Sequence, residues 1–119
     1  MTIRQIDIIN EVVRKNRNSH DYSINRPNWC GCFIGNFAEW KYFLKKNKEN
    51  IAYGIKYRIN LQNGERWTWV PEGTKAYDVS RYDRVIVPRR ISFDYMHNFF
   101  CTVGLYCTEI EWYGLPDED

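Results

Sequence analysis

One alternation constrains this sequence more than any other feature. Between residues 51 and 61 an apolar side chain stands at every second position, and Asn63-Gly64, Trp67 and Trp69 follow. The alternating residues are Ile51, Tyr53, Ile55, Tyr57, Ile59 and Leu61. Strict alternation is typical of a half-buried β-strand, and Asn-Gly is a frequent hairpin turn. The segment 51–70 therefore predicts a β-hairpin.

Burial determines the register of this hairpin. A two-residue loop at Asn63-Gly64 would place the two apolar sets on opposite faces of the pair. A three-residue loop from Gln62 to Gly64 pairs Ile59 with Trp67 and Tyr57 with Trp69, which collects the large apolar groups on one face. We therefore expect the three-residue loop. The opposite face is then polar and basic, and carries Lys56, Arg58, Asn60, Arg66 and Thr68.

Capping residues and helical spacing predict two helices. Thr2 and Gln5 match a capping box, and the apolar residues behind them recur at helical spacing: Ile6, Ile9, Val12 and Val13. This predicts a helix over residues 3–15. Asn36 and Glu39 form a second cap, ahead of the apolar positions Phe37, Trp40, Phe43 and Leu44.

The remaining segments carry weaker signals. Residues 16–31 are expected to form a long loop and residues 71–83 a turn-rich segment. Short strands are expected at 84–87 and 105–113. Apolar spacing favours a third helix near residues 93–100, although aromatic runs also suit strands, so helix and strand both stay open for residues 93–107.

These elements predict an α+β fold. We expect an antiparallel sheet of about four strands centred on the 51–70 hairpin, with two or three helices packed on its apolar face. A length of 119 residues fits one domain spanning residues 1–119. Residues 115–119 are acidic and are expected to form a frayed C-terminal tail.

Composition excludes several classes of protein. The formal net charge of +2 excludes an acidic nucleic-acid mimic and argues against a strongly basic nucleic-acid coat. The N-terminus lacks a signal-peptide layout, and no apolar run reaches the length of a membrane helix. We expect a soluble cytoplasmic protein with no membrane partner and with reduced cysteines.

No motif indicates catalysis or a cofactor. A nucleophilic serine elbow, a metalloprotease helix and a phosphate loop are all missing from the sequence. The weak metal candidates are Cys30, Cys32, His97 and Cys101, with His20 and Cys107 as further ligands. Their spacing departs from the usual zinc pattern. The sequence therefore favours a protein that is not an enzyme and binds no cofactor.

Aromatic content supplies the leading functional hypothesis. Phe, Trp and Tyr make up 17% of the chain, and Trp, Tyr and Arg are enriched in protein interfaces. We expect a small interaction protein that binds and modulates, most simply inhibits, a protein partner, of the kind made by bacteria, phages or mobile elements. The candidate contact residues are Tyr22, Trp29, Tyr77, Tyr82, Trp112 and Tyr113.

Arginine content supplies the alternative. Guanidinium groups bind phosphate bidentately. A surface of this kind would bind nucleic acid or a phosphorylated small molecule. The candidates are Arg58, Arg66, Arg81, Arg84, Arg89 and Arg90.

Overall fold

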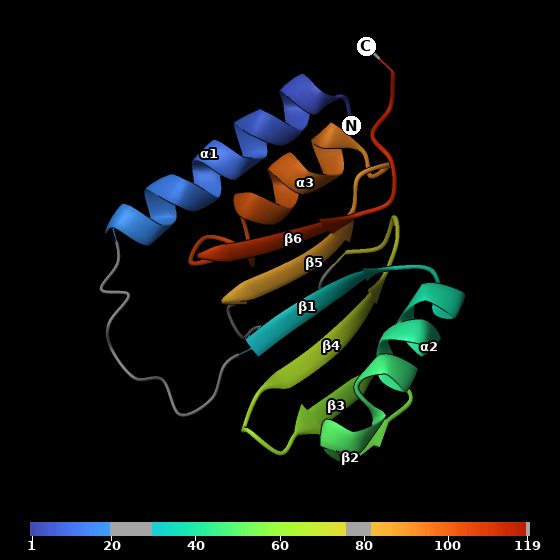
Figure 1. Cartoon of the computed structure of the whole chain (residues 1–119). Coiled ribbons are helices and arrows are strands. Elements are labelled where there is room, and N and C mark those ends of the chain that lie inside the picture. The colour runs from blue at the N-terminus through green and yellow to red at the C-terminus, as the bar shows by residue number, and fades with distance from the viewer. Residues whose placement is uncertain (20–29, 76–81, 119) are drawn as a thin grey trace.

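The computed structural model describes residues 1–19, 30–75 and 82–118. It is α+β, with a mixed sheet of six strands in the order β2-β3-β4-β1-β5-β6 (Figure 1). The strands are β1 (Cys30–Gly35), β2 (Ile51–Ile55), β3 (Arg58–Leu61), β4 (Arg66–Pro71), β5 (Arg84–Pro88) and β6 (Glu109–Tyr113). The helices are α1 (Ile3–Ser19), α2 (Phe37–Lys46) and α3 (Phe93–Phe100), with a short 3-10 turn, η1 (Lys48–Asn50), before β2.

The sheet has two halves of different character. Strands β2, β3 and β4 form an antiparallel meander. Strand β1 lies parallel to both β4 and β5, and β6 lies parallel to β5. The prediction of an antiparallel sheet of about four strands was therefore wrong in strand number and direction. The 51–70 segment lies at one side of the sheet and not at its centre.

Helices cover both faces of the sheet, where the sequence predicted one. On one face α1 and α3 pack against β1, β5 and β6, and this core includes Ile9, Cys32, Val85, Val87 and Met96. On the other face α2 packs against β1, β3 and β4, and that core consists of Phe33, Trp40, Ile59, Leu61 and Trp67. Figure 1 shows α2 on the opposite side of the sheet from α1 and α3.

Strand β1 lies within the segments that the sequence left without a strand. Its residues Gly31 to Gly35 are all buried, because a parallel strand between two neighbours is covered on both faces. Such a strand shows no alternation. Its glycines are there for close packing: a side-chain carbon at Gly31 would overlap the Trp67 ring, and one at Gly35 would overlap the Tyr113 hydroxyl.

The predicted register between β3 and β4 is confirmed. Ile59 pairs with Trp67, and the Trp69 backbone N–H donates to the Tyr57 carbonyl at 2.8 Å. The loop is held by the Leu61 N–H donating to the Glu65 carbonyl at 2.8 Å, with Gly64 at a positive φ of 95°. A turn at residues 56–57 nevertheless divides the long alternation into two strands, β2 and β3.

The helices begin where their caps predict. Thr2 and Gln5 exchange both capping-box hydrogen bonds, and α1 then extends to Ser19, beyond the predicted end at residue 15. Asn36 and Glu39 cap α2 in the same way. Residues 93–100 are helical, and the final strand is shorter than predicted, beginning at Glu109. In the acidic tail, the Asp117 N–H donates to the Met1 carbonyl at 2.9 Å.

Candidate functional site

A β-bulge changes the surface of the outer strand β2. Ile51 pairs with Leu61, but Tyr53 pairs with Asn60, so one extra residue, Ala52, is inserted between them. The insertion reverses the alternation. Ile51 keeps its place against the α2-side core, whereas Tyr53 and the residues after it change face. The prediction that the large apolar groups of this segment all share one face is therefore wrong for Tyr53 and Ile55.

Residues directly opposite each other in an antiparallel pair lie on the same face of the sheet. Tyr53 therefore lies on the face of Asn60, and Ile55 on the face of Arg58. Tyr53 is 65% exposed and Ile55 55% exposed. Arg66 pairs with Asn60, and so belongs to the same face. We call this set the β2 face: Tyr53, Ile55, Arg58, Asn60 and Arg66.

Strand β2 also carries no charged side chain. Natural edge strands are usually protected by charge, proline or a covering element, because an open edge pairs with other chains. The charged residues nearest to the strand are Lys48 and Glu49 before it and Lys56 after it. In the described part of the chain, β2 is an outer strand without charged side chains, with an oppositely charged pair before it and a lysine after it.

The predicted aromatic contact residues do not form one surface. Tyr82 is buried and stacks on Phe99 in the α1–α3 core. Trp112 packs against the same core and donates its indole N–H to Asn10 Oδ1 at 2.8 Å. Tyr113 lies on the opposite face of the sheet, where its hydroxyl donates to the Ile34 carbonyl at 2.7 Å. The other three candidates, Tyr22, Trp29 and Tyr77, lie outside the described residues.

The predicted arginine set is divided as well. Arg84 forms ion pairs with Glu65 and Glu109 (to Glu109 Oε2 at 2.7 Å). The Arg89 guanidinium donates to the Gly114 carbonyl at 2.7 Å. Arg58 and Arg66 alone among the described candidates share the β2 face. Arg90 forms ion pairs with Glu39 and Glu72. Arg81 lies outside the described residues.

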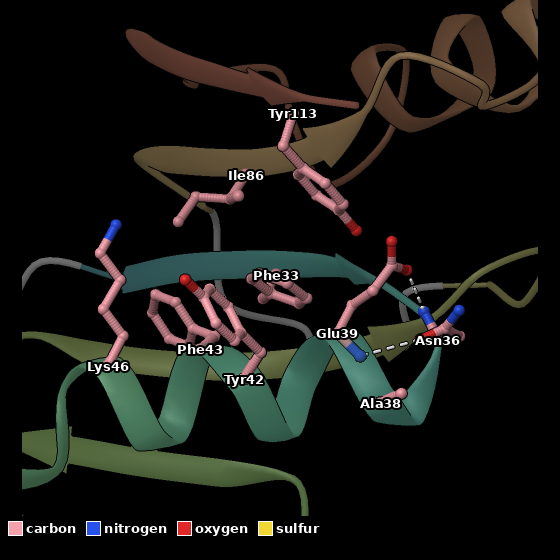
Figure 2. A pocket seen from close by; sticks show the side chains of 9 residues that line it. All are labelled: Phe33, Asn36, Ala38, Glu39, Tyr42, Phe43, Lys46, Ile86 and Tyr113. Carbon is pink, nitrogen blue, oxygen red and sulfur yellow. Dashed lines mark hydrogen bonds between the residues drawn. The ribbon is translucent and has the colours of Figure 1, made fainter. Parts of the chain in front are cut away.

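A groove of about 370 Å³ runs beside α2 (Figure 2). It lies over the part of the α2-side face that strands β5 and β6 provide. Figure 2 shows Ile86 and Tyr113 extending from these strands toward the helix, with Phe33 beneath them and the rings of Tyr42 and Phe43 on the helix side. Lys46 stands at one end of the groove and Glu39 at the other.

Ion pairs fix the Glu39 end of the groove. Arg90 donates to both Glu39 oxygens, at 2.9 and 2.6 Å, and to Glu72 at 2.6 Å. The hydrogen bonds from Arg90 hold the pKa of Glu39 below its usual value. The Glu39 carboxylate also accepts the Asn36 backbone N–H at 2.9 Å. Burial raises the pKa of Tyr113 beside it, so the phenol stays protonated.

Of the predicted metal candidates, the structure brings Cys101 and His97 together but places Cys30 and Cys32 elsewhere. Cys101 Sγ lies 3.8 Å from His97 Nε2, while Cys32 is buried in the α1–α3 core and Cys30 packs against that core. Over residues 1–19, 30–75 and 82–118 no three His, Cys, Asp or Glu side chains are grouped so that they could hold a metal ion. Burial raises the pKa of Cys107 to about 12, which makes that thiol a poor nucleophile.

Comparison of the chain with protein-family models, with curated proteins and with solved structures found no match. Among the described residues no helix has both the length and the apolar character needed to cross a membrane.

Two surface features, the bulge in β2 and the groove beside α2, were not predicted from the sequence. The bulge at Ala52 has no sequence signature of its own. An alternation of eleven residues is, however, about twice the usual length of a strand, which is a reason to expect an interruption. The groove could not be predicted because it forms only where β5 and β6 lie beside α2. That arrangement follows from the parallel pairing of β1, β5 and β6, which the sequence did not indicate.

Proposed function

We propose that this protein binds a protein partner by adding an extended segment of that partner to the outer strand β2. The observation that supports the proposal is the combination of an open, uncharged strand with the exposed side chains of Tyr53 and Ile55. In strand addition, main-chain hydrogen bonds supply affinity, and alternate side chains supply specificity.

The surroundings of β2 define the chemistry of the partner segment. Lys48 and Glu49 precede the strand and offset each other in charge, whereas Lys56 follows it and Arg66 lies exposed on the β2 face. A complementary segment has apolar residues at alternate positions, to contact Tyr53 and Ile55, and an acidic residue at the end that lies beside Lys56. Inhibition of the partner, and an origin in bacteria, phages or mobile elements, stay predictions from the sequence.

Peptide selection tests strand addition without knowledge of the partner. We expect a random peptide library, selected on the immobilised protein, to yield extended apolar sequences with an acidic residue at one end. Tyr53→Lys combined with Ile55→Lys should weaken binding of these peptides by about 100-fold, or about 2.7 kcal/mol. N-methylation of alternate peptide nitrogens should have a similar effect, because it removes main-chain donors.

Tyr106→Lys provides the matched control, since Tyr106 is an exposed tyrosine outside β2. It should leave the affinity unchanged. Backbone amide NMR shifts on peptide addition should be centred on residues 51–55. Peptides that bind the double-lysine variant as tightly as the wild type would show that β2 is not the binding strand.

The bulge also favours a second candidate, single-stranded nucleic acid. It places the Tyr53 ring on the same face as Arg58 and Arg66, and single-strand binding sites combine rings with cations in this way. Fluorescence anisotropy with a labelled oligonucleotide separates the candidates. Loss of oligonucleotide binding on Arg66→Glu, but not on Lys45→Glu, would favour nucleic acid over a protein segment.

A further inference from the structure

The groove beside α2 has features of a ligand site that is separate from β2. Its volume of about 370 Å³ falls within the usual range for small-molecule sites. Its floor is apolar, and its rings are already packed: Phe33 lies 5.0 Å from Phe43 and 5.7 Å from Tyr113, measured between ring centroids. The Tyr113 hydroxyl bond to Ile34 fixes one wall. A ligand would therefore enter a largely formed site.

The two ends of the groove differ in the sign of their charged side chain and in whether that side chain is ion-paired. At one end Glu39 is neutralised by Arg90 and by the backbone N–H of Asn36. At the other end Lys46 is exposed and forms no ion pair with any residue that the structure describes. As far as the described residues define it, the groove thus presents an apolar, ring-lined body with one available cation.

The length of the groove argues against a docked helix. Glu39 and Lys46 are seven residues apart on α2, which corresponds to about 10 Å along the helix. Figure 2 shows Lys46 at the opposite end of α2 from Glu39, on the side of the groove where Ile86 of β5 lies. There the sheet surface is charged, with Arg84 paired to Glu109. A long apolar helix face would cover these ions.

We propose that this groove binds a small aromatic carboxylate, with its rings between α2 and the side chains of Ile86 and Tyr113 and its carboxylate at Lys46. A flat ring can pack on the exposed faces and edges of the aromatic lining. The anion supplies a counter-charge that no described residue gives to Lys46. This site does not depend on the β2 edge, so the two proposals stand or fall separately.

The test compares two probes that differ only in charge, 2-naphthoate and 2-naphthamide. Titration followed by backbone amide NMR should shift residues of α2, β5 and β6 for both probes. We expect 2-naphthoate to bind about fivefold more tightly, the effect of one exposed ion pair. Lys46→Gln should abolish this difference, whereas Lys45→Gln should preserve it, because Lys45 does not line the groove.

Two further variants complete the test. Tyr42→Ala removes a side chain that is 70% exposed, so the fold tolerates it, and it should weaken both probes equally. The double-lysine variant of β2 should bind 2-naphthoate as the wild type does. Equal affinity of the two probes for the wild type, or shifts centred outside the groove, would overturn the proposal. The proposal would also be overturned if the protein bound no naphthoate but bound selected peptides in a way that depends on Tyr42. The groove would then accommodate a protein segment.

Discussion

The two outer strands of the sheet, β2 and β6, are built on different principles. Strand β6 carries Glu109 and Glu111, and α1 packs beside it. Side chains of α1 bind the chain just before β6: Asn16 donates to the Cys107 carbonyl at 3.0 Å, and Arg17 to the Thr108 carbonyl at 2.8 Å. Strand β2 has no charged residue, and four of its five positions are exposed.

The difference bears on which strand a partner would contact. Charged side chains are a usual protection of an edge, and β6 carries two glutamates, while α1 covers one of its faces. On β6 the aromatic side chain of Trp112 is held by the core, whereas on β2 the ring of Tyr53 extends into solvent. Within residues 1–19, 30–75 and 82–118, one outer strand is thus charged and the other is uncharged and exposed, which is the basis of the proposed strand addition.

The largest expected difference between the edges is in thiol reactivity. Cys107, just before β6, is fully buried, and burial raises its pKa to about 12. In a Cys101→Ser background, we expect the thiol introduced by Tyr53→Cys to react with iodoacetamide at pH 8 at least about a thousandfold faster than Cys107, because an exposed thiol has a pKa near 8.5. Peptide mapping by mass spectrometry measures both rates.

Denaturant provides the control for this comparison. In unfolding concentrations of urea the two thiols should react at similar rates, since burial is lost. Equal rates in the native protein would mean that the β6 edge opens as readily as β2, and the contrast between the edges would fail.

Local patterns predicted part of this fold correctly. The register of β3 against β4 followed from placing the apolar groups on one face, because a slip of one residue would reverse every side chain. The starts of α1 and α2 followed from Thr2 and Asn36, since the unpaired N–H groups of a first turn require nearby acceptors. These features depend on contacts between residues close in sequence.

Features that depend on distant contacts were not predictable. Strand β1 is covered on both faces, so Cys32, Phe33 and Ile34 are buried toward different cores and leave no alternation to detect. Gly31 is needed in β1 because the Trp67 ring packs against it, and Trp67 lies far away in the sequence. The glycine alone therefore did not indicate a strand. The candidate surface on β2 depended on the bulge at Ala52, which became visible only with the strand pairing.

Stability should also distinguish the two edges. Trp112→Ala removes a half-buried ring and its hydrogen bond to Asn10, and should lower the free energy of unfolding by about 2–3 kcal/mol. Tyr53→Ala should change it by less than about 0.5 kcal/mol, because the ring is 65% exposed. Urea titrations measure both values.

Trp112→Phe separates the two contributions at β6. It keeps most of the ring and loses the indole N–H, so a loss of about 1 kcal/mol is expected. A loss on Tyr53→Ala as large as that on Trp112→Ala would show that the Tyr53 ring is packed in solution, and β2 would then not be an open edge.

The smallest expected difference is electrostatic. On the side of β5 and β6, Arg90 connects Glu39 of α2 to Glu72, and the pKa of Glu39 is held below its usual 4.5. A carboxyl group whose pKa is lowered by folding stabilises the protein above its unfolded pKa, and this stabilisation is lost as the pH falls through the folded pKa. Solvent screening at Arg90, which is 42% exposed, limits the contribution to about 1 kcal/mol.

We therefore expect Arg90→Ala to lower the free energy of unfolding by about 1 kcal/mol at pH 7, with the difference from the wild type shrinking as the pH falls below about 4.5. Glu39→Gln should likewise lose its difference from the wild type in acid. Lys56→Gln, next to β2, is the matched control, because a lysine keeps its charge throughout this range and should give a difference that does not vary with pH. Urea titrations from pH 3 to pH 7 measure these profiles. The opposite result would be a stability difference that varies with pH for Lys56→Gln and stays constant for Arg90→Ala. The pH-sensitive contacts would then lie on the β2 side of the sheet and not on the β6 side.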